Sequence, residues 1–289
     1  MKFKIGFDID KGKNSEEVKD EKTFSSENSD NVENFVYLDN HSSGTVAKKS
    51  VVEVYFEDRG ISCSYYNDAF DLKLGDIVFV EGKLEGLPGR VTDISYSFKI
   101  KLSEYKKVIR VADTTVKGSF LLGGRCLFTK QENALPFEKI RGWFMPYTYS
   151  EEEYVIGSDD FSFPLRAPGA IKISKDVGGR GVDYFESGRV LYIELKNNHG
   201  RALVKGSRIY EVEFDYKNGE ISNLNCECFC SGICKHIFSV ILQLNELILI
   251  AEDNYPELDI MEGYLAIVNK EVFYGYALSE DKYGALVLK

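Results

Sequence analysis

Four residues in the carboxy-terminal third of the chain have the types and the spacing of a metal site. Cys226 and Cys228 form a C-x-C pair, and Cys234 and His236 form a C-x-H pair, all within eleven positions. Thiolates and an imidazole are ligands that Zn²⁺ prefers, and four of them complete its tetrahedral shell. We therefore predict a structural zinc site, because four protein ligands leave no open position for a substrate.

The same spacing predicts the elements that hold these ligands. A C-x-C pair at a strand end places both thiolates on one side, because alternate side chains of a strand share a face. An apolar stretch from about Lys235 to Ala251 predicts a buried helix, whose positive amino-terminal end favours thiolate. The zinc should thus fix the tip of a β-hairpin against this helix. Cys230 is an alternative ligand in place of Cys228, or else a free thiol.

Residues 170–252 carry further features around the ligands. The apolar run CKHIFSVILQL begins at the C-x-H pair, and the strand patterns RVLYIEL and ALVKGSRIYEVEF precede the C-x-C pair. In this combination the segment resembles the SWIM zinc finger. The resemblance implies a ββα zinc module that binds DNA, RNA or protein. The ligands that it implies are Cys226, Cys228, Cys234 and His236.

Strand patterns also fill the segment from about Val51 to Lys130. The runs VVEVYF, GDIVFV, GRVTDI and FKIKL are rich in β-branched and aromatic residues, with Gly and Asp between them. The spaced glycines of LKLGDIVFVEGKLEGLPGRVTDI resemble the KOW and related SH3-like barrel motifs of translation, transcription and replication-restart proteins. The resemblance implies a small barrel over residues 46–130.

The most basic stretch of the chain, YSFKIKLSEYKKVIR, lies in this segment. Its cations, which we call the basic ridge, are Lys99, Lys101, Lys106, Lys107 and Arg110. If FKIKL is a strand, Lys99 and Lys101 share a face and are placed to contact phosphates, with an aromatic ready to stack on a base. The competing interpretation is a solvated face over a buried aliphatic one, since Glu104 interrupts the run.

Composition limits the classes of function. The 289 residues are enough for about two domains, and a 44% hydrophobic fraction can form packed cores. A formal charge of −10 disfavours a chain-wide grip on nucleic acid, so such binding needs a local basic patch. We expect a cytoplasmic protein, and in a reducing compartment the clustered cysteines favour metal over disulfides. Neither a signal peptide nor a membrane segment is predicted, and motifs for a phosphate-binding loop or a nucleophile elbow are missing.

These patterns predict an α+β, mostly β fold in five parts. They are a short strand and polar linker over 1–45, the barrel over 46–130, a connecting segment over 131–169, the zinc finger domain over 170–252 and a β tail over 253–289. The tail strands are expected at Tyr264–Val268, Val272–Ala277 and Gly284–Leu288, and the GGRG sequence at 178–181 is expected to form a loop.

We expect a non-enzymatic protein that uses the finger's loops and the basic ridge to bind DNA or RNA, as a binding module or adaptor. The alternative is a protein-interaction subunit that docks a separate ATPase or nuclease through an acidic surface. A hydrolase with an unrecognised carboxylate site is a third hypothesis.

Overall fold

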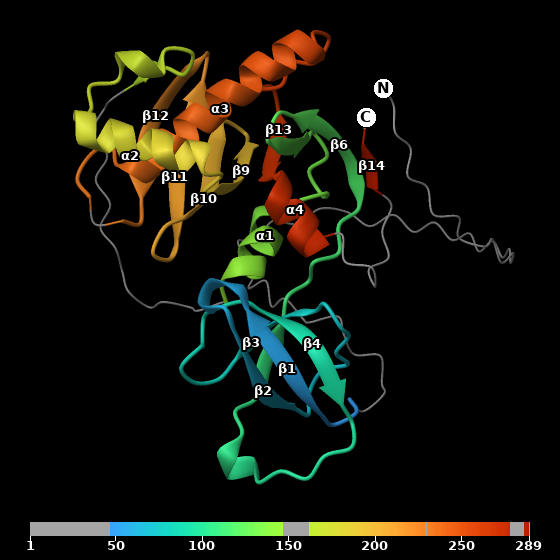
Figure 1. The fold of residues 1–289 in the computed structure, drawn as a ribbon. Helices are drawn as coiled ribbons and strands as arrows, with labels where there is room; N and C mark the ends of the chain where they lie inside the picture. The colour runs from blue at the N-terminus through green and yellow to red at the C-terminus, as the bar shows by residue number, and fades with distance from the viewer. Residues whose placement is uncertain (1–46, 147–161, 229, 278–285, 289) are drawn as a thin grey trace, which may run out of the picture.

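The computed structural model describes residues 47–146, 162–228, 230–277 and 286–288. In these ranges the chain forms two β-sheets and four α-helices, which confirms an α+β, mostly β fold (Figure 1). All strand pairs are antiparallel apart from one short parallel pair, β6 (Gly118–Gly123) with β14 (Leu286–Leu288). The strand and linker predicted over 1–45 lie outside the described residues.

The smaller sheet has five strands in the order β2-β1-β4-β3-β5. Their bounds are β1 Ser50–Phe56, β2 Ile61–Asn67, β3 Ile77–Val80, β4 Gly89–Ser95 and β5 Val108–Val111. A bridge between Tyr66 and Lys107 joins the two edges, so the sheet curls toward closure. Gly89 is needed where β4 crosses the core, because an added Cβ would lie 2.4 Å from a methyl of Val54. The KOW and SH3-like assignment stays a prediction.

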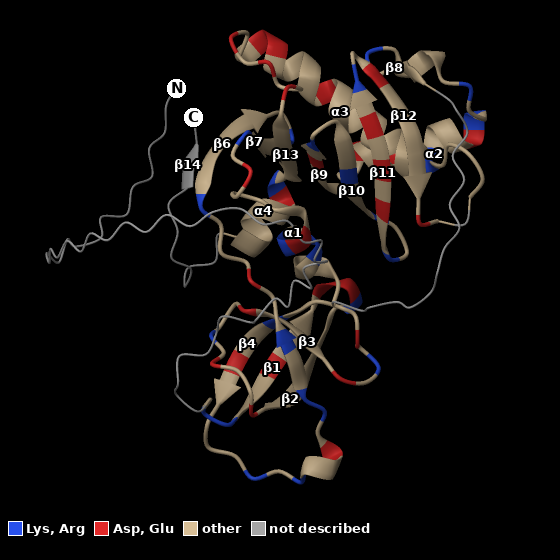
Figure 2. Cartoon of the chain, turned by 180° about the vertical axis from the view of Figure 1, so that it is seen from behind, with Lys and Arg blue, Asp and Glu red and all other residues tan. Residues whose placement is uncertain are grey.

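The larger sheet has nine strands in the order β14-β6-β7-β13-β9-β10-β11-β12-β8 (Figure 2). The bounds not yet given are β7 Cys126–Thr129, β8 Phe163–Pro164, β9 Val190–Lys196, β10 His199–Lys205, β11 Ile209–Lys217, β12 Glu220–Cys226 and β13 Tyr264–Asn269. The strands β6 and β7, which the sequence placed in the barrel, belong to this sheet because β7 pairs with β13.

Helices cover both faces of the larger sheet (Figure 1). They are α1 Phe137–Phe144, α2 Lys175–Glu186, α3 Lys235–Asn254 and α4 Lys270–Ala277. Strand alternation sends Ile193 and Leu195 into the core under α3, and Tyr192 into a second core with residues of α1 and α4. The helix predicted over Lys235–Ala251 is confirmed, and it continues for three more residues.

The connecting segment predicted over 131–169 contains a core helix. Trp143 of α1 is fully buried, stacks on Tyr276 of α4 and donates a hydrogen bond from Nε1 to the carbonyl of Asp113 at 2.7 Å. The side chains of Ile77 and Phe79, from β3 of the smaller sheet, pack into the same core. The two sheets therefore share a hydrophobic contact that the division at residue 130 did not anticipate.

Three local predictions were wrong. FKIKL forms no strand; this part of the chain is a long β4–β5 loop with a 3-10 turn at Leu102–Glu104. The expected strand at Val272–Ala277 is α4, whose Phe273 and Ala277 lie one helical turn apart and face the core. The GGRG sequence lies inside α2, where Gly181 permits close approach to Phe238 of α3.

Candidate metal centre

The four predicted ligands converge between two neighbouring elements. Cys226 is the last residue of β12, and Cys228 follows it. Cys234 is the residue that precedes α3, and His236 lies in the first turn of that helix. One ligand atom from each residue can be chosen so that all four lie within 4.8 Å of one another. The structure thus confirms a Cys/His cluster that is suited to metal binding.

The two sulfur–nitrogen distances that involve His236 fit a tetrahedral zinc site. Zn–S bonds of about 2.3 Å and a Zn–N bond of about 2.0 Å place tetrahedral ligand atoms about 3.5–3.8 Å apart. The Nδ1 atom of His236 lies 3.6 Å from the sulfur of Cys226 and 3.8 Å from that of Cys234. With three soft sulfurs and one imidazole nitrogen, the donor set suits Zn²⁺ better than a hard cation such as Mg²⁺.

The thiols of the cluster differ in acidity. A hydrogen bond from Cys226 outweighs burial and lowers the pKa of Cys234 to about 4, with help from His236 and the backbone N–H of Ile237. Burial raises the pKa of Cys228 to about 11, while the hydrogen bond to Cys234 and burial raise the pKa of Cys226. The three thiols therefore share protons unequally, and Cys234 is the most acidic of them. A bound zinc ion would displace those protons, because it ligates thiolates.

The cluster lies at the open end of the β11–β12 hairpin, and not at its tip as the sequence suggested. The hairpin turns at Asn218 and Gly219, whereas Cys226 pairs with Val212 at the other end of the strands. This end also carries the β10–β11 turn, which begins at Gly206. A metal bound here would link β12 to α3 and lie beside that turn.

Aromatic rings hold the imidazole of His236 in place. Tyr210 stacks on it with ring centroids 4.3 Å apart, and Tyr184 of α2 meets it edge-on at 5.4 Å. Gly206 leaves room for this arrangement, since an added Cβ would lie 2.7 Å from the Tyr210 ring and 3.2 Å from Nε2 of His236. This packing gives the G-S-x-x-Y sequence at 206–210 a role beside the metal ligand. Sequence reasoning missed Tyr184, because no local spacing connects it to the cysteines.

Cys230 is exposed and does not belong to the group of atoms that could share an ion. Its backbone N–H donates a hydrogen bond of 2.8 Å to the carbonyl of Cys228, so it takes part in the turn that leads away from the C-x-C pair. The described geometry therefore favours Cys228 as the fourth ligand.

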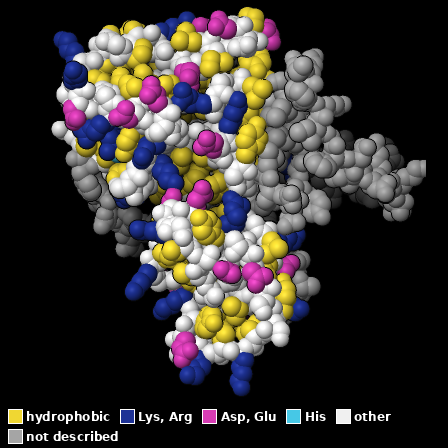
Figure 3. All heavy atoms as spheres, in the orientation of Figure 1, with side chains coloured by type: hydrophobic (Ala, Val, Ile, Leu, Met, Phe, Trp, Pro, Cys, Tyr) yellow, Lys and Arg dark blue, Asp and Glu magenta, His cyan; other side chains and the backbone are white. Residues whose placement is uncertain are grey.

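Four of the five cations of the basic ridge lie in the β4–β5 loop, and the fifth lies in β5. Lys101 pairs with Glu104 in the middle of the β4–β5 loop, and Lys107 forms an ion pair of 2.8 Å with Asp68. Lys99 and Lys106 are exposed. Figure 3 shows Lys and Arg side chains at the lower end of the molecule, where Figure 1 places this loop, with Asp or Glu beside them.

The remaining ridge residue points elsewhere. Arg110 donates a hydrogen bond of 3.2 Å to the carbonyl of Met145, and its guanidinium lies 5.6 Å from the ring centre of Phe79. These contacts lie toward the junction between the two sheets. The structure therefore does not gather the five predicted cations on one strand face.

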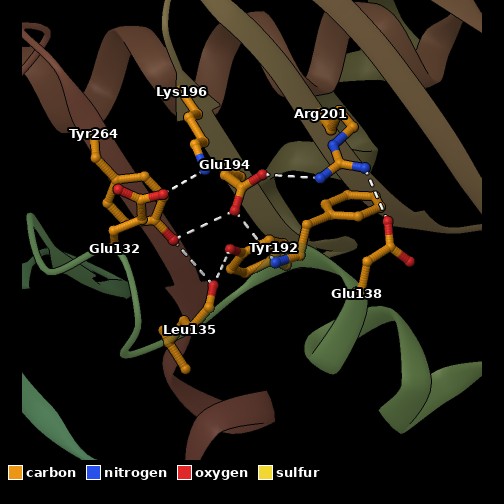
Figure 4. Close-up of polar contacts among 9 residues, drawn as sticks. Glu132, Leu135, Glu138, Tyr192, Glu194, Lys196, Arg201 and Tyr264 are labelled. Carbon is orange, nitrogen blue, oxygen red and sulfur yellow. Dashed lines mark hydrogen bonds and ion pairs between the residues drawn. The ribbon is translucent and has the colours of Figure 1, made fainter. Parts of the chain in front are cut away.

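A second polar cluster, which the sequence did not indicate, lies on the opposite face of the larger sheet (Figure 4). Glu194 of β9 is buried and accepts hydrogen bonds from the backbone N–H of Phe137, from Arg201 and from Tyr264. Pro136, at the start of α1, offers no side-chain cap, so this carboxylate takes that role. The cluster is internally satisfied, which is typical of a structural network rather than a reactive site.

No protein-family model matches the chain, and no curated protein or solved structure is similar enough to count as a match. Among the described residues, no helix has the length and apolar character required to cross a membrane. The function must therefore be inferred from the site itself.

Proposed function

We propose that the chain is a zinc-binding protein of the SWIM type, in which Cys226, Cys228, Cys234 and His236 hold a structural Zn²⁺. The convergence of three thiols and one imidazole between β12 and α3 carries this proposal. When bound, the ion would join a strand end to a helix start, and coupling of this kind is worth on the order of 10 kcal/mol in small zinc modules. Four protein ligands leave no coordination position for a substrate, which supports a role without catalysis.

The function that we propose is a nucleic-acid-associated binding module or adaptor that acts in the cytoplasm. This role is supported by the resemblance to SWIM fingers and by three cations beside the rings that contact His236, namely Arg189, Arg208 and Lys235. A protein-interaction subunit that docks a separate ATPase or nuclease is the second candidate. The formal charge of −10 and the pairing of Lys107 with Asp68 favour the second candidate, because they weaken the pull of the basic ridge on phosphates.

The metal proposal is tested with two matched serine variants. Cys234→Ser should lose zinc and the cooperative melting of the carboxy-terminal unit, because it removes a buried ligand. Cys230→Ser, its exposed neighbour, should keep one zinc per chain and the wild-type melting curve. The zinc content per chain is measured by elemental mass spectrometry, and thermal unfolding is followed by circular dichroism. Retained zinc and retained cooperative melting in Cys234→Ser would reject the proposed site.

The binding proposal is tested by fluorescence anisotropy of the zinc-loaded full chain against single-stranded DNA, duplex DNA and RNA. Binding in the micromolar range or tighter that weakens as salt rises supports a nucleic-acid module, since phosphate contacts release counterions. The same titration after chelation of zinc shows whether the affinity depends on the metal. If none of the three probes binds, the protein-interaction role replaces the nucleic-acid role.

A further inference from the structure

Three cations surround the aromatic rings that hold His236. The guanidinium of Arg208 lies 5.1 Å from the ring centre of Tyr210. Across the imidazole, the ring centre of Tyr184 has the guanidinium of Arg189 and the ammonium of Lys235 each at 4.8 Å. We call these three residues the finger cations; they come from the β10–β11 turn, the residue before β9 and the first turn of α3.

Two cations of the basic ridge, Lys101 and Lys107, form ion pairs, whereas the finger cations form none with the described residues. Among the described residues, no carboxylate forms an ion pair with Arg189, Arg208 or Lys235. Arg189 and Arg208 are exposed, and Lys235 is half-buried. Figure 3 shows that Lys and Arg side chains are frequent around α2, with Asp and Glu between them.

Three carboxylates near the finger cations, those of Asp183, Glu186 and Glu227, form no ion pair with them. Glu227 attracts Arg208, yet the contact between them is a hydrogen bond of 3.4 Å from the guanidinium to the backbone carbonyl. The Glu227 carboxylate itself accepts from the backbone N–H of Glu211. Asp183 and Glu186 of α2 are exposed and form no ion pair with the finger cations. The cationic nitrogens therefore keep donors for an outside anion.

We propose that the finger cations and the half-buried rings of Tyr184 and Tyr210 form the surface that contacts the phosphates of a single-stranded nucleic acid. The proposal rests on the nucleic-acid role proposed above and identifies its location. In single-strand binding, cations beside aromatic rings pair with phosphates. Here the two rings already contact His236 and the finger cations, so their role is to position these cations. Both rings touch His236, and Lys235 lies between two of the proposed ligands, so the finger cations are adjacent to the proposed metal site.

The test compares two double variants with the same change in charge. Arg189→Gln with Arg208→Gln removes two finger cations and leaves Lys235, which lies between two ligands, in place. Lys99→Gln with Lys106→Gln removes two exposed ridge cations. The probes are fluorescein-labelled oligothymidine and oligouridine of about 20 nucleotides, long enough to cover a typical single-strand site. Zinc content is measured for every variant, as a readout that is independent of binding.

The finger variant should bind roughly tenfold more weakly. Its log–log salt slope should be smaller by about 1.4, because each of the two phosphates that is no longer neutralised accounts for about 0.7. The ridge variant should stay close to wild type, and both should keep one zinc per chain. Weaker binding in the ridge variant alone would overturn the location but leave the nucleic-acid role intact. Absence of binding by the wild type would overturn both, and the two probes decide between DNA and RNA.

Discussion

The substitution Glu194→Gln tests how strongly the buried polar cluster fixes α1 on the larger sheet. The side chain of Glu194 is 8% exposed, and its two oxygens accept from different groups. The backbone N–H of Phe137 donates at 3.2 Å to one oxygen, and Arg201 donates at 3.1 Å to the other. A glutamine has one acceptor and one donor in these places, so either Phe137 or Arg201 must face an N–H group.

The loss of stability expected for Glu194→Gln follows from these two hydrogen bonds. A hydrogen bond that involves a charged group contributes about 1.5–3 kcal/mol, and a buried donor without a partner costs about 1–3 kcal/mol. Arg201 is 31% exposed and also pairs with Glu138, so solvent and this second carboxylate reduce the penalty. We expect Glu194→Gln to lower the free energy of unfolding by about 2–3 kcal/mol, which is below the range of about 3–5 kcal/mol for a fully buried ion pair because Arg201 is partly exposed.

The assay is urea unfolding of the zinc-loaded protein, followed by circular dichroism and by the fluorescence of Trp143. This tryptophan is the only one in the chain and lies in α1, so its signal reports directly on the helix that Glu194 caps. Glu132→Gln is the control, because its ion pair with Lys196 is about half exposed on both sides and should contribute less than about 1 kcal/mol. A decrease below about 0.5 kcal/mol in Glu194→Gln, or an equal decrease in the control, would refute the reasoning.

Three further predictions concern packing, pH and metal. Gly181→Ala should destabilise the fold by about 1–3 kcal/mol in thermal melts, since the new Cβ would lie 2.7 Å from the Phe238 ring. Gly179→Ala is the control: it has open space in the same helix and should stabilise the fold by about 0.5–1 kcal/mol. Burial would raise the pKa of Asp113, but hydrogen bonds from Lys139 and Thr115 lower it. The ionised Asp113 carboxylate therefore stabilises the fold at neutral pH, and this contribution is lost as the pH falls through the pKa of the unfolded state and then the lower pKa of the folded state. Asp113→Asn should lower the free energy of unfolding at pH 7 but change it little near pH 2, as measured by urea unfolding. Chelation of zinc should speed amide exchange in α3 but leave the strands of the smaller sheet protected, because that sheet has its own core.

The metal cluster was accessible to sequence reasoning because its ligands are local. Cys226 and His236 are ten positions apart, and the helix that presents the histidine is a long apolar run. Periodicity and composition are sufficient for such features, since a helix forms within one segment of chain. The surroundings of His236 were not accessible, because Tyr184 and Tyr210 reach it from α2 and from β11.

The sequence by itself determined the features that depend on neighbouring residues, namely the mostly β composition, the helix that starts at Lys235 and the Cys/His cluster. Tertiary structure decided what depends on distant partners. GGRG lies in α2, where Gly181 allows close packing against Phe238 of α3, and FKIKL lies in a loop, while Lys107 forms the bridge to Tyr66 of β2. Hydrophobic alternation and glycine content indicate which conformations a segment can adopt. The strand or helix packed beside the segment determines which of these conformations has the lower free energy.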